Sequence, residues 1–133
     1  MAEPRWLTAD QVIALNAAIL ISTQETHFVR DLAALESAVA RPLNRFHYLS
    51  DEALSSLTAD LIYGIGKAHA FEQGNKRTAW AAGRIFARLN GYNIVVPKEI
   101  QEPVAKKIEQ ILTAEADGSR LISWIEPLLV RSS

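Results

Sequence analysis

Apolar residues recur at helical spacing along most of the chain, and this periodicity constrains the fold more than any other feature. A capping-box pattern at Thr8 and Gln11 opens a predicted helix from about Ala9 to Ser22. The clearest stripe predicts a long helix, with Ser50 as its cap; its members are Leu54, Leu57, Leu61, Ile65 and Ala68. Strand patterns are scarce and internal repeats are absent, so the predicted fold class is all-α.

Four further helices are predicted over residues 31–40, 75–89, 104–116 and 119–129, and an extended segment over residues 92–96. Asp31 caps the first of these helices and Pro42 stops it, leaving irregular chain up to Leu49. The helix predicted over residues 75–89 begins near Asn75 and ends at Asn90-Gly91, a common C-terminal signature. Ser119 caps the last helix and Pro127 kinks it.

The composition fits one globular domain and indicates which partners and which location to expect. The chain has 133 residues, which we expect to form a single domain over 1–133, and a net charge of −1. That charge gives no global basic field, so no nucleic-acid partner is expected. No apolar run approaches the roughly 18 residues of a membrane span, so no membrane partner is expected. There is no cysteine and no secretion pattern at the N-terminus, so the expected location is the cytoplasm.

The stretch from His69 to Thr78 places a histidine, a glycine, an amide and two cations directly before a predicted helix. The first backbone N–H groups of a helix lack partners within it and carry partial positive charge, so this stretch favours an anion such as phosphate. Gly74 lets the backbone approach a ligand, and Asn75 offers a donor and an acceptor. An imidazole at His69 is then placed to accept a proton from a hydroxyl group.

Lys76 and Arg77 are cations in the first turn of that helix, where they oppose its dipole at a cost of about 0.3–1 kcal/mol each. A negative group should compensate them. Two alternatives are open: Glu72 compensates them inside the protein, which is a structural role, or the phosphates of a bound nucleotide do so, which is a functional one. Phe71 is expected to lie in the core and to anchor the loop from beneath.

A second stretch, Arg45-Phe46-His47, mixes a cation, an aromatic ring and an imidazole in the segment predicted to be irregular. Loop aromatics usually pack or bind. We therefore expect these three residues to form a flap that docks a target segment over the pocket, with packing as the alternative.

The stretch from His69 to Thr78 resembles the Fic/Doc superfamily signature H-x-F-x-[D/E]-[G/A]-N-[G/K]-R, and its Asn-Lys-Arg-Thr resembles the Doc (death-on-curing toxin) branch. Residues 30–42 are similar to the "RD…LESA…RP" segment of Doc-like proteins. Trp80 stands where the Fic branch carries a second arginine, which also favours Doc. The likeness covers roughly residues 7 to 97, and it implies a compact all-α Fic fold with the motif loop between two central helices.

The resemblance implies an enzyme that transfers part of ATP to a protein hydroxyl. By that analogy His69 is the general base, Lys76 and Arg77 assist catalysis, and Gly74, Asn75, Lys76 and Arg77 hold the phosphates. The family's acid that binds Mg²⁺ falls at Gln73, a weaker neutral ligand. Glu72, one position earlier, is the alternative metal ligand.

The leading hypothesis is a Doc-like toxin of a toxin-antitoxin pair that moves the γ-phosphate of ATP to a translation-related protein such as an elongation factor. A small antitoxin protein would hold it inactive. A second hypothesis is AMP transfer of the Fic type. A third is a Fic-fold module that binds nucleotide or protein, with catalysis weakened because Gln73 replaces the acid.

Overall fold

A computed structural model describes residues 3–100, 103–113 and 118–132 of the chain. Within these residues the protein is built from six α-helices and one two-stranded antiparallel sheet. The helices are α1 (Ala9–Ile21), α2 (Leu32–Leu49), α3 (Leu54–Ala68), α4 (Asn75–Leu89), α5 (Pro103–Thr113) and α6 (Ser119–Ile125). This confirms the predicted fold class and four of the predicted helix positions. Residues 114–116 of the fifth predicted helix lie outside the described residues.

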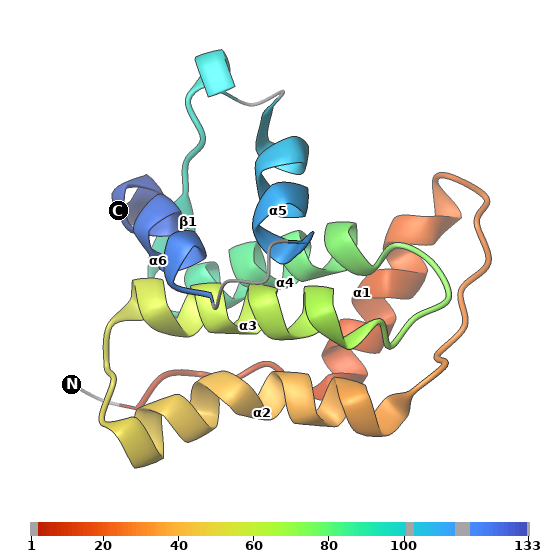
Figure 1. Cartoon of the computed structure of the whole chain (residues 1–133), viewed down its shortest axis with the longest axis horizontal. Coiled ribbons are helices and arrows are strands. Elements are labelled where there is room, and N and C mark those ends of the chain that lie inside the picture. Colours follow the sequence, from red (N-terminus) through yellow and green to blue (C-terminus); the bar gives the residue numbers. More distant parts are fainter. Residues whose placement is uncertain (1–2, 101–102, 114–117, 133) are drawn as a thin grey trace.

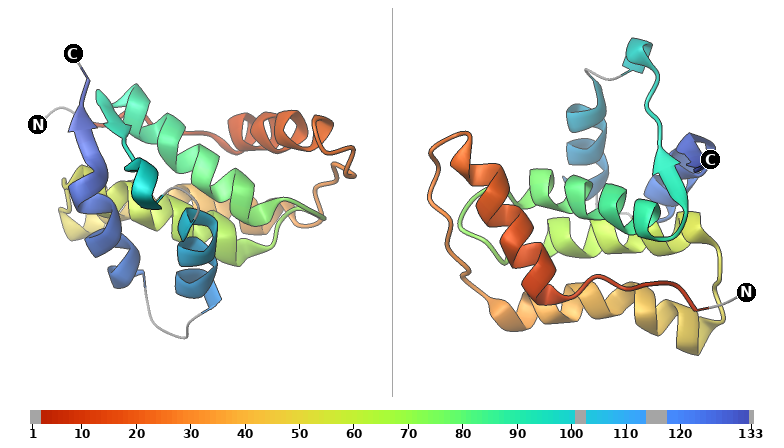
Figure 2. Two further views of the ribbon diagram at one scale, coloured as in Figure 1. Left: turned by 90° about the horizontal axis from the view of Figure 1, so that it is seen from above. Right: turned by 180° about the vertical axis from the view of Figure 1, so that it is seen from behind.

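Helix α3 lies at the centre of the molecule, with α2 and α4 packed along it and α6 across its first half (Figure 1). Helix α1 crosses α4 near the turn between α3 and α4. Both ends of the described chain lie at one side, and that turn lies at the opposite side (Figure 2). The loop that carries the motif is therefore a connection between two central helices, as the resemblance implied.

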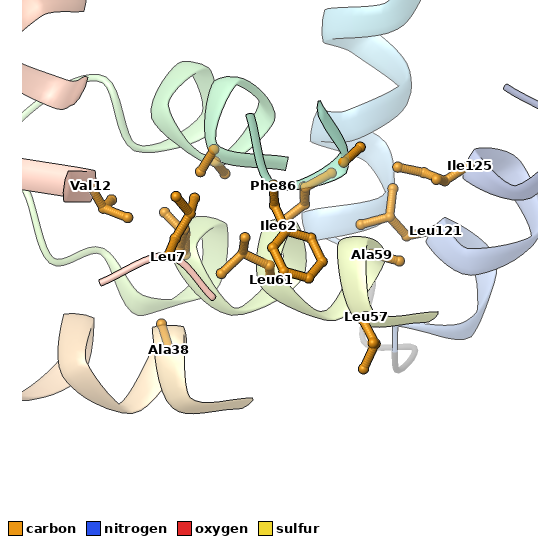
Figure 3. Packing of buried hydrophobic residues seen from close by; sticks show 14 of the residues in the cluster. Leu7, Val12, Ala38, Leu57, Ala59, Leu61, Ile62, Phe86, Leu121 and Ile125 are labelled. Atoms are coloured by element: carbon orange, nitrogen blue, oxygen red, sulfur yellow. The ribbon is translucent and has the colours of Figure 1, made fainter. Parts of the chain in front are cut away.

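The core forms around the apolar stripe of α3. Leu57, Leu61, Ile62 and Ile65 are at most 1% exposed, and Phe86 of α4 packs among them (Figure 3). Gly83 lets α4 approach closely, because a Cβ there would lie 2.4 Å from Ile62. The stripe thus holds the two helices between which the motif loop runs.

Helix α2 does not stop at Pro42 but continues to Leu49, so the predicted stop is wrong. An internal proline normally costs a helix about 3 kcal/mol. Pro42 is buried against the rest of the protein, and the arginines on either side of it both reach Asp60 of α3. Arg41 approaches that carboxylate to 2.8 Å and Arg45 to 4.0 Å. The burial of Pro42 and these contacts with α3 favour the helical conformation on both sides of the proline.

The predicted caps of two helices are also wrong. Ser50 ends α2 in a left-handed conformation with a φ of 54°, and α3 begins after Ala53 without a side-chain cap. Gly118, not Ser119, is the N-cap of α6. These errors shift helix boundaries. Of the predicted stripe of α3, Leu57, Leu61 and Ile65 are buried, whereas Leu54 and Ala68 at its ends are only partly buried.

The last predicted helix ends early and is followed by a strand. Helix α6 stops at Ile125, and the 3₁₀ turn η2 (Glu126–Leu128) includes Pro127. Strand β2 (Leu129–Arg131) then pairs with β1 (Tyr92–Ile94), inside the segment predicted to be extended (Figure 2). A second 3₁₀ turn, η1 (Lys98–Ile100), precedes α5. None of the helices in the described ranges combines the length and apolarity needed to cross a membrane.

Candidate functional site

The motif loop begins and ends in left-handed backbone. His69 closes α3 with a φ of 48°, and Gly74 opens α4 with a φ of 77°. For histidine this conformation costs about 1–2 kcal/mol, so surrounding contacts must hold it. At Gly74 a side chain is disfavoured by the left-handed backbone. It is also disfavoured by crowding, because a Cβ would lie 2.9 Å from Leu20 and 3.2 Å from the amide nitrogen of Asn16.

Backbone hydrogen bonds fix the loop to the segment before α2. The Arg30 N–H donates to the Ala70 carbonyl at 2.7 Å, and the Glu72 N–H donates to the Phe28 carbonyl at 2.9 Å. Between them Phe71 is fully buried, which confirms its predicted anchoring role. The segment around Phe28 thus forms one edge of the site.

The side chain of Asn75 closes the loop from inside. Its Oδ1 accepts from the Phe71 N–H at 3.0 Å, and its Nδ2 donates to the Phe71 carbonyl at 2.9 Å. The N-cap residue of α4, Gly74, gives the first turn no side-chain hydrogen bond. The N–H groups of Asn75, Lys76 and Arg77 therefore have no partner within the helix, as an anion site requires.

A buried residue that sequence reasoning missed holds the loop from below. Asn16 is fully buried in α1, and its Nδ2 donates to the Gln73 carbonyl at 3.0 Å and to Thr78 Oγ1 at 2.9 Å. Its Oδ1 lies 2.7 Å from His27 Nδ1. The only signal in the sequence was a single amide that interrupts an apolar helical run.

Inside the protein, the two cations of the motif are compensated by carboxylates other than Glu72. Arg77 Nη2 lies 2.8 and 2.9 Å from the two carboxylate oxygens of Glu25, and Lys76 lies 3.3 Å from Glu109 of α5. Glu72 instead faces Arg30 at 3.6 Å. The expectation that Glu72 compensates the motif cations is wrong, because its side chain turns toward the segment before α2.

The Glu25 carboxylate is held in its charged form. A hydrogen bond from Thr23, followed by the hydrogen bond and charge of Arg77, keeps the pKa of Glu25 below its usual value. Both ion pairs of the motif are partly exposed to solvent, with Arg77 46% and Glu25 31% exposed. Such pairs contribute little to stability, so a bound anion can replace the carboxylate.

These groups surround a pocket of about 830 Å³. Residues 72–77 line it together with Glu25, His69, Trp80, Ile108 and Glu109. The size lies within the usual range for small-molecule sites. His69 is exposed, and its imidazole makes no hydrogen bond or ion pair with the described residues. The predicted base and the predicted phosphate-binding residues therefore meet in one cavity.

The donors near the motif suit a metal ion carried by a nucleotide better than a protein-bound one. Gln73 and Glu72 both line the pocket, as the sequence prediction required. Among the described residues no three histidine, aspartate or glutamate side chains converge on one point. Mg²⁺ bound with phosphates takes only one or two protein ligands, so these donors fit that mode of binding.

The predicted docking flap is not a loop, and it does not reach the pocket. Arg45, Phe46 and His47 lie in the last turns of α2. Arg45 pairs with Asp51 at 2.8 Å, Phe46 packs edge-on against Trp6, and His47 contacts Glu3 at 2.7 Å. The expected loop is wrong, because these residues continue α2 and pack against the N-terminal segment and the seam between α2 and α3, and none of the three lines the pocket. Their contact with a target protein stays a prediction.

Comparisons with known proteins place the chain in a family. The sequence profile described as the Fic/DOC family matches residues 6–87, more than half of the chain. The chain therefore belongs to the Fic/DOC family. It is also 32% identical over 95 residues to a protein named Toxin Doc from Mycolicibacterium smegmatis, a match that covers 67% of this chain and 68% of that protein. The resemblance drawn from the motif is confirmed.

Proposed function

We propose that this protein is a toxin of the Doc type that transfers the γ-phosphate of ATP to a hydroxyl group of a translation-related protein, for which an elongation factor is a candidate. The observation that carries the proposal is the pocket itself. An exposed imidazole with no partner among the described residues shares it with two cations and the open N-terminus of α4. Its likeness to a protein named Toxin Doc supports the toxin role.

In the proposed reaction the hydroxyl oxygen of the target attacks the γ-phosphorus. The bond from that phosphorus to the β–γ bridging oxygen breaks, ADP leaves, and His69 takes the hydroxyl proton. Arg77 and Lys76 leave their carboxylate partners to stabilise the phosphate charge, together with the N–H groups of the first turn of α4.

Mg²⁺ is part of the proposal. The amide oxygen of Gln73 or the carboxylate of Glu72 would hold it, and the ion would neutralise charge on the phosphates. The neutral Gln73 also favours a second candidate function, a Fic-fold module that binds nucleotide or protein with weak catalysis.

Partner and location complete the proposal. By analogy with the toxin role, a small antitoxin protein would keep the enzyme inactive. Its place of action would be the cytoplasm, where translation proceeds. Co-expression that yields a stoichiometric complex with a small neighbouring gene product would support this part.

The test is to incubate the protein with cell extract and with ATP labelled at either the γ or the α position. Label on protein from the γ position alone supports phosphate transfer. Label from the α position overturns it in favour of AMP transfer. Label from neither, with ATP still bound, leaves the binding module.

The metal proposal is tested by Gln73→Asp, with Gln73→Asn as the matched neutral control. A carboxylate holds Mg²⁺ better than an amide, so the aspartate variant should show increased transfer and a steeper dependence on Mg²⁺. The asparagine variant should show neither change. If both variants behave alike, Glu72 or another ligand holds the ion.

A further inference from the structure

The pocket has a second, apolar side that the phosphate-binding motif does not use. Trp80 lies one helical turn beyond Lys76 on the same face of α4, about 6 Å further along the helix axis. Ile108 of α5 lines the pocket with it. A ligand with phosphates at the start of α4 would therefore meet an aromatic ring and an aliphatic side chain next.

The indole of Trp80 is held in place by its neighbours. The ring of Trp124 from α6 lies 5.8 Å away, centroid to centroid, at an angle of 41°. Trp80 is half-buried, and it both packs against the core and lines the pocket. A ring supported on one side and open to a cavity on another can stack with a flat ligand without losing much freedom.

We infer that Trp80 stacks with the base of the bound nucleotide, while its phosphates lie at the N-terminus of α4. This inference rests on the proposed use of ATP and adds the residue that binds the nucleoside half. Base–aromatic stacking needs only the π-face of the base, which suits the apolar groups present here. The ribose would lie between Trp80 and Lys76, which are one turn apart.

The experiment compares ATP with inorganic tripolyphosphate, which has the phosphates but no base. Binding of both in the presence of Mg²⁺ is measured by calorimetry for the wild-type protein, Trp80→Leu and Trp80→Phe. Wild type should bind ATP about tenfold more tightly than tripolyphosphate. Trp80→Leu should lose that advantage while its tripolyphosphate affinity stays unchanged, and Trp80→Phe should keep most of it.

A fluorescence measurement guards against misfolding of the leucine variant. ATP should quench tryptophan emission of the wild-type protein, and tripolyphosphate should not. Trp80→Phe should still bind ATP but lose most of the quenching. Quenching that persists in this variant would overturn the inference.

The outcomes separate the inference from the proposed function. If wild type binds ATP no better than tripolyphosphate, or if Trp80→Leu weakens both ligands equally, the stacking role is overturned and the use of ATP stands. If wild type binds neither ligand, the proposed function fails and the stacking role fails with it.

Discussion

Two arginine–carboxylate pairs, one in the middle of α3 and one beside the motif loop, differ in how far the acid is exposed to solvent. In the middle of α3, the Asp60 side chain is 9% exposed and is shared by Arg41 and Arg45 of α2. Beside the motif loop, the Glu25 side chain is 31% exposed and pairs with Arg77, in addition to its hydrogen bond from Thr23. A buried acid cannot exchange its partner for water or ligand, whereas an exposed one can. The same chemistry therefore joins α2 to α3 at the buried pair and leaves a replaceable contact at the exposed pair beside the pocket.

The largest effect should come from His69 in the pocket, whose imidazole has no partner among the described residues. His69→Ala is expected to reduce transfer about 10²- to 10⁴-fold with little change in thermal stability, because the imidazole is exposed. Labelled ATP and a melting curve measure the two quantities. His47→Ala, at the far end of α2, is the control and should keep full activity. Transfer above a tenth of wild type in His69→Ala would reject the role of general base.

The second-largest effect is expected on ligand binding in the pocket. Arg77→Ala should weaken ATP binding at least about tenfold, since a charge-assisted contact to phosphate is lost. Arg41→Ala removes an equally exposed guanidinium, the one that pairs with Asp60, and should leave ATP affinity unchanged. Calorimetry of both variants decides the matter. Equal affinities for the two variants would place the phosphates elsewhere.

At the buried pair of Asp60 with Arg41, the expected effect is on folding stability. Asp60→Asn should lower the free energy of unfolding by about 2 kcal/mol, because the carboxylate accepts two hydrogen bonds from Arg41 at 3.0 and 2.8 Å. Urea titration measures this loss, and Glu36→Gln on the exposed face of α2 serves as the control. The folded fraction should bind ATP normally. A change in ATP affinity would show that the Asp60 pair and the pocket are energetically coupled.

The smallest effect tests whether Glu25 competes with the ligand. Glu25→Gln should strengthen ATP binding severalfold at low salt, because Arg77 no longer has to leave a carboxylate. The gain should shrink as ionic strength rises, since exposed charges are screened. Weaker binding in this variant would show instead that Glu25 positions Arg77 for the phosphates.

The helices of the centre could be predicted because their signals are local. The α3 stripe and the Asn90-Gly91 stop are read from neighbouring residues, and both were found in the structure. The continuation of α2 past Pro42 depends on Asp60, far along the chain, and so it escaped prediction. Strand β2 depends on pairing with β1 and escaped for the same reason.

The site divides in the same way. The motif residues follow one another in sequence, so their meeting in one pocket could be expected. The motif residues are contacted from three other parts of the chain, by Glu25, Asn16 and Glu109. None of these three residues stands out by its neighbours in the sequence. Local patterns thus identified the reactive groups but not the groups that hold or balance them.

The hydrogen bonds of Asn16 determine where one proton resides. A backbone carbonyl can only accept, so the atom that faces Gln73 must be the amide nitrogen, and Oδ1 therefore faces His27. Because Oδ1 has no proton to give, His27 must carry one on Nδ1 whether its ring is neutral or charged. The anchor beneath the motif loop therefore sets the tautomer of His27, with a ring proton on the nitrogen that faces Asn16.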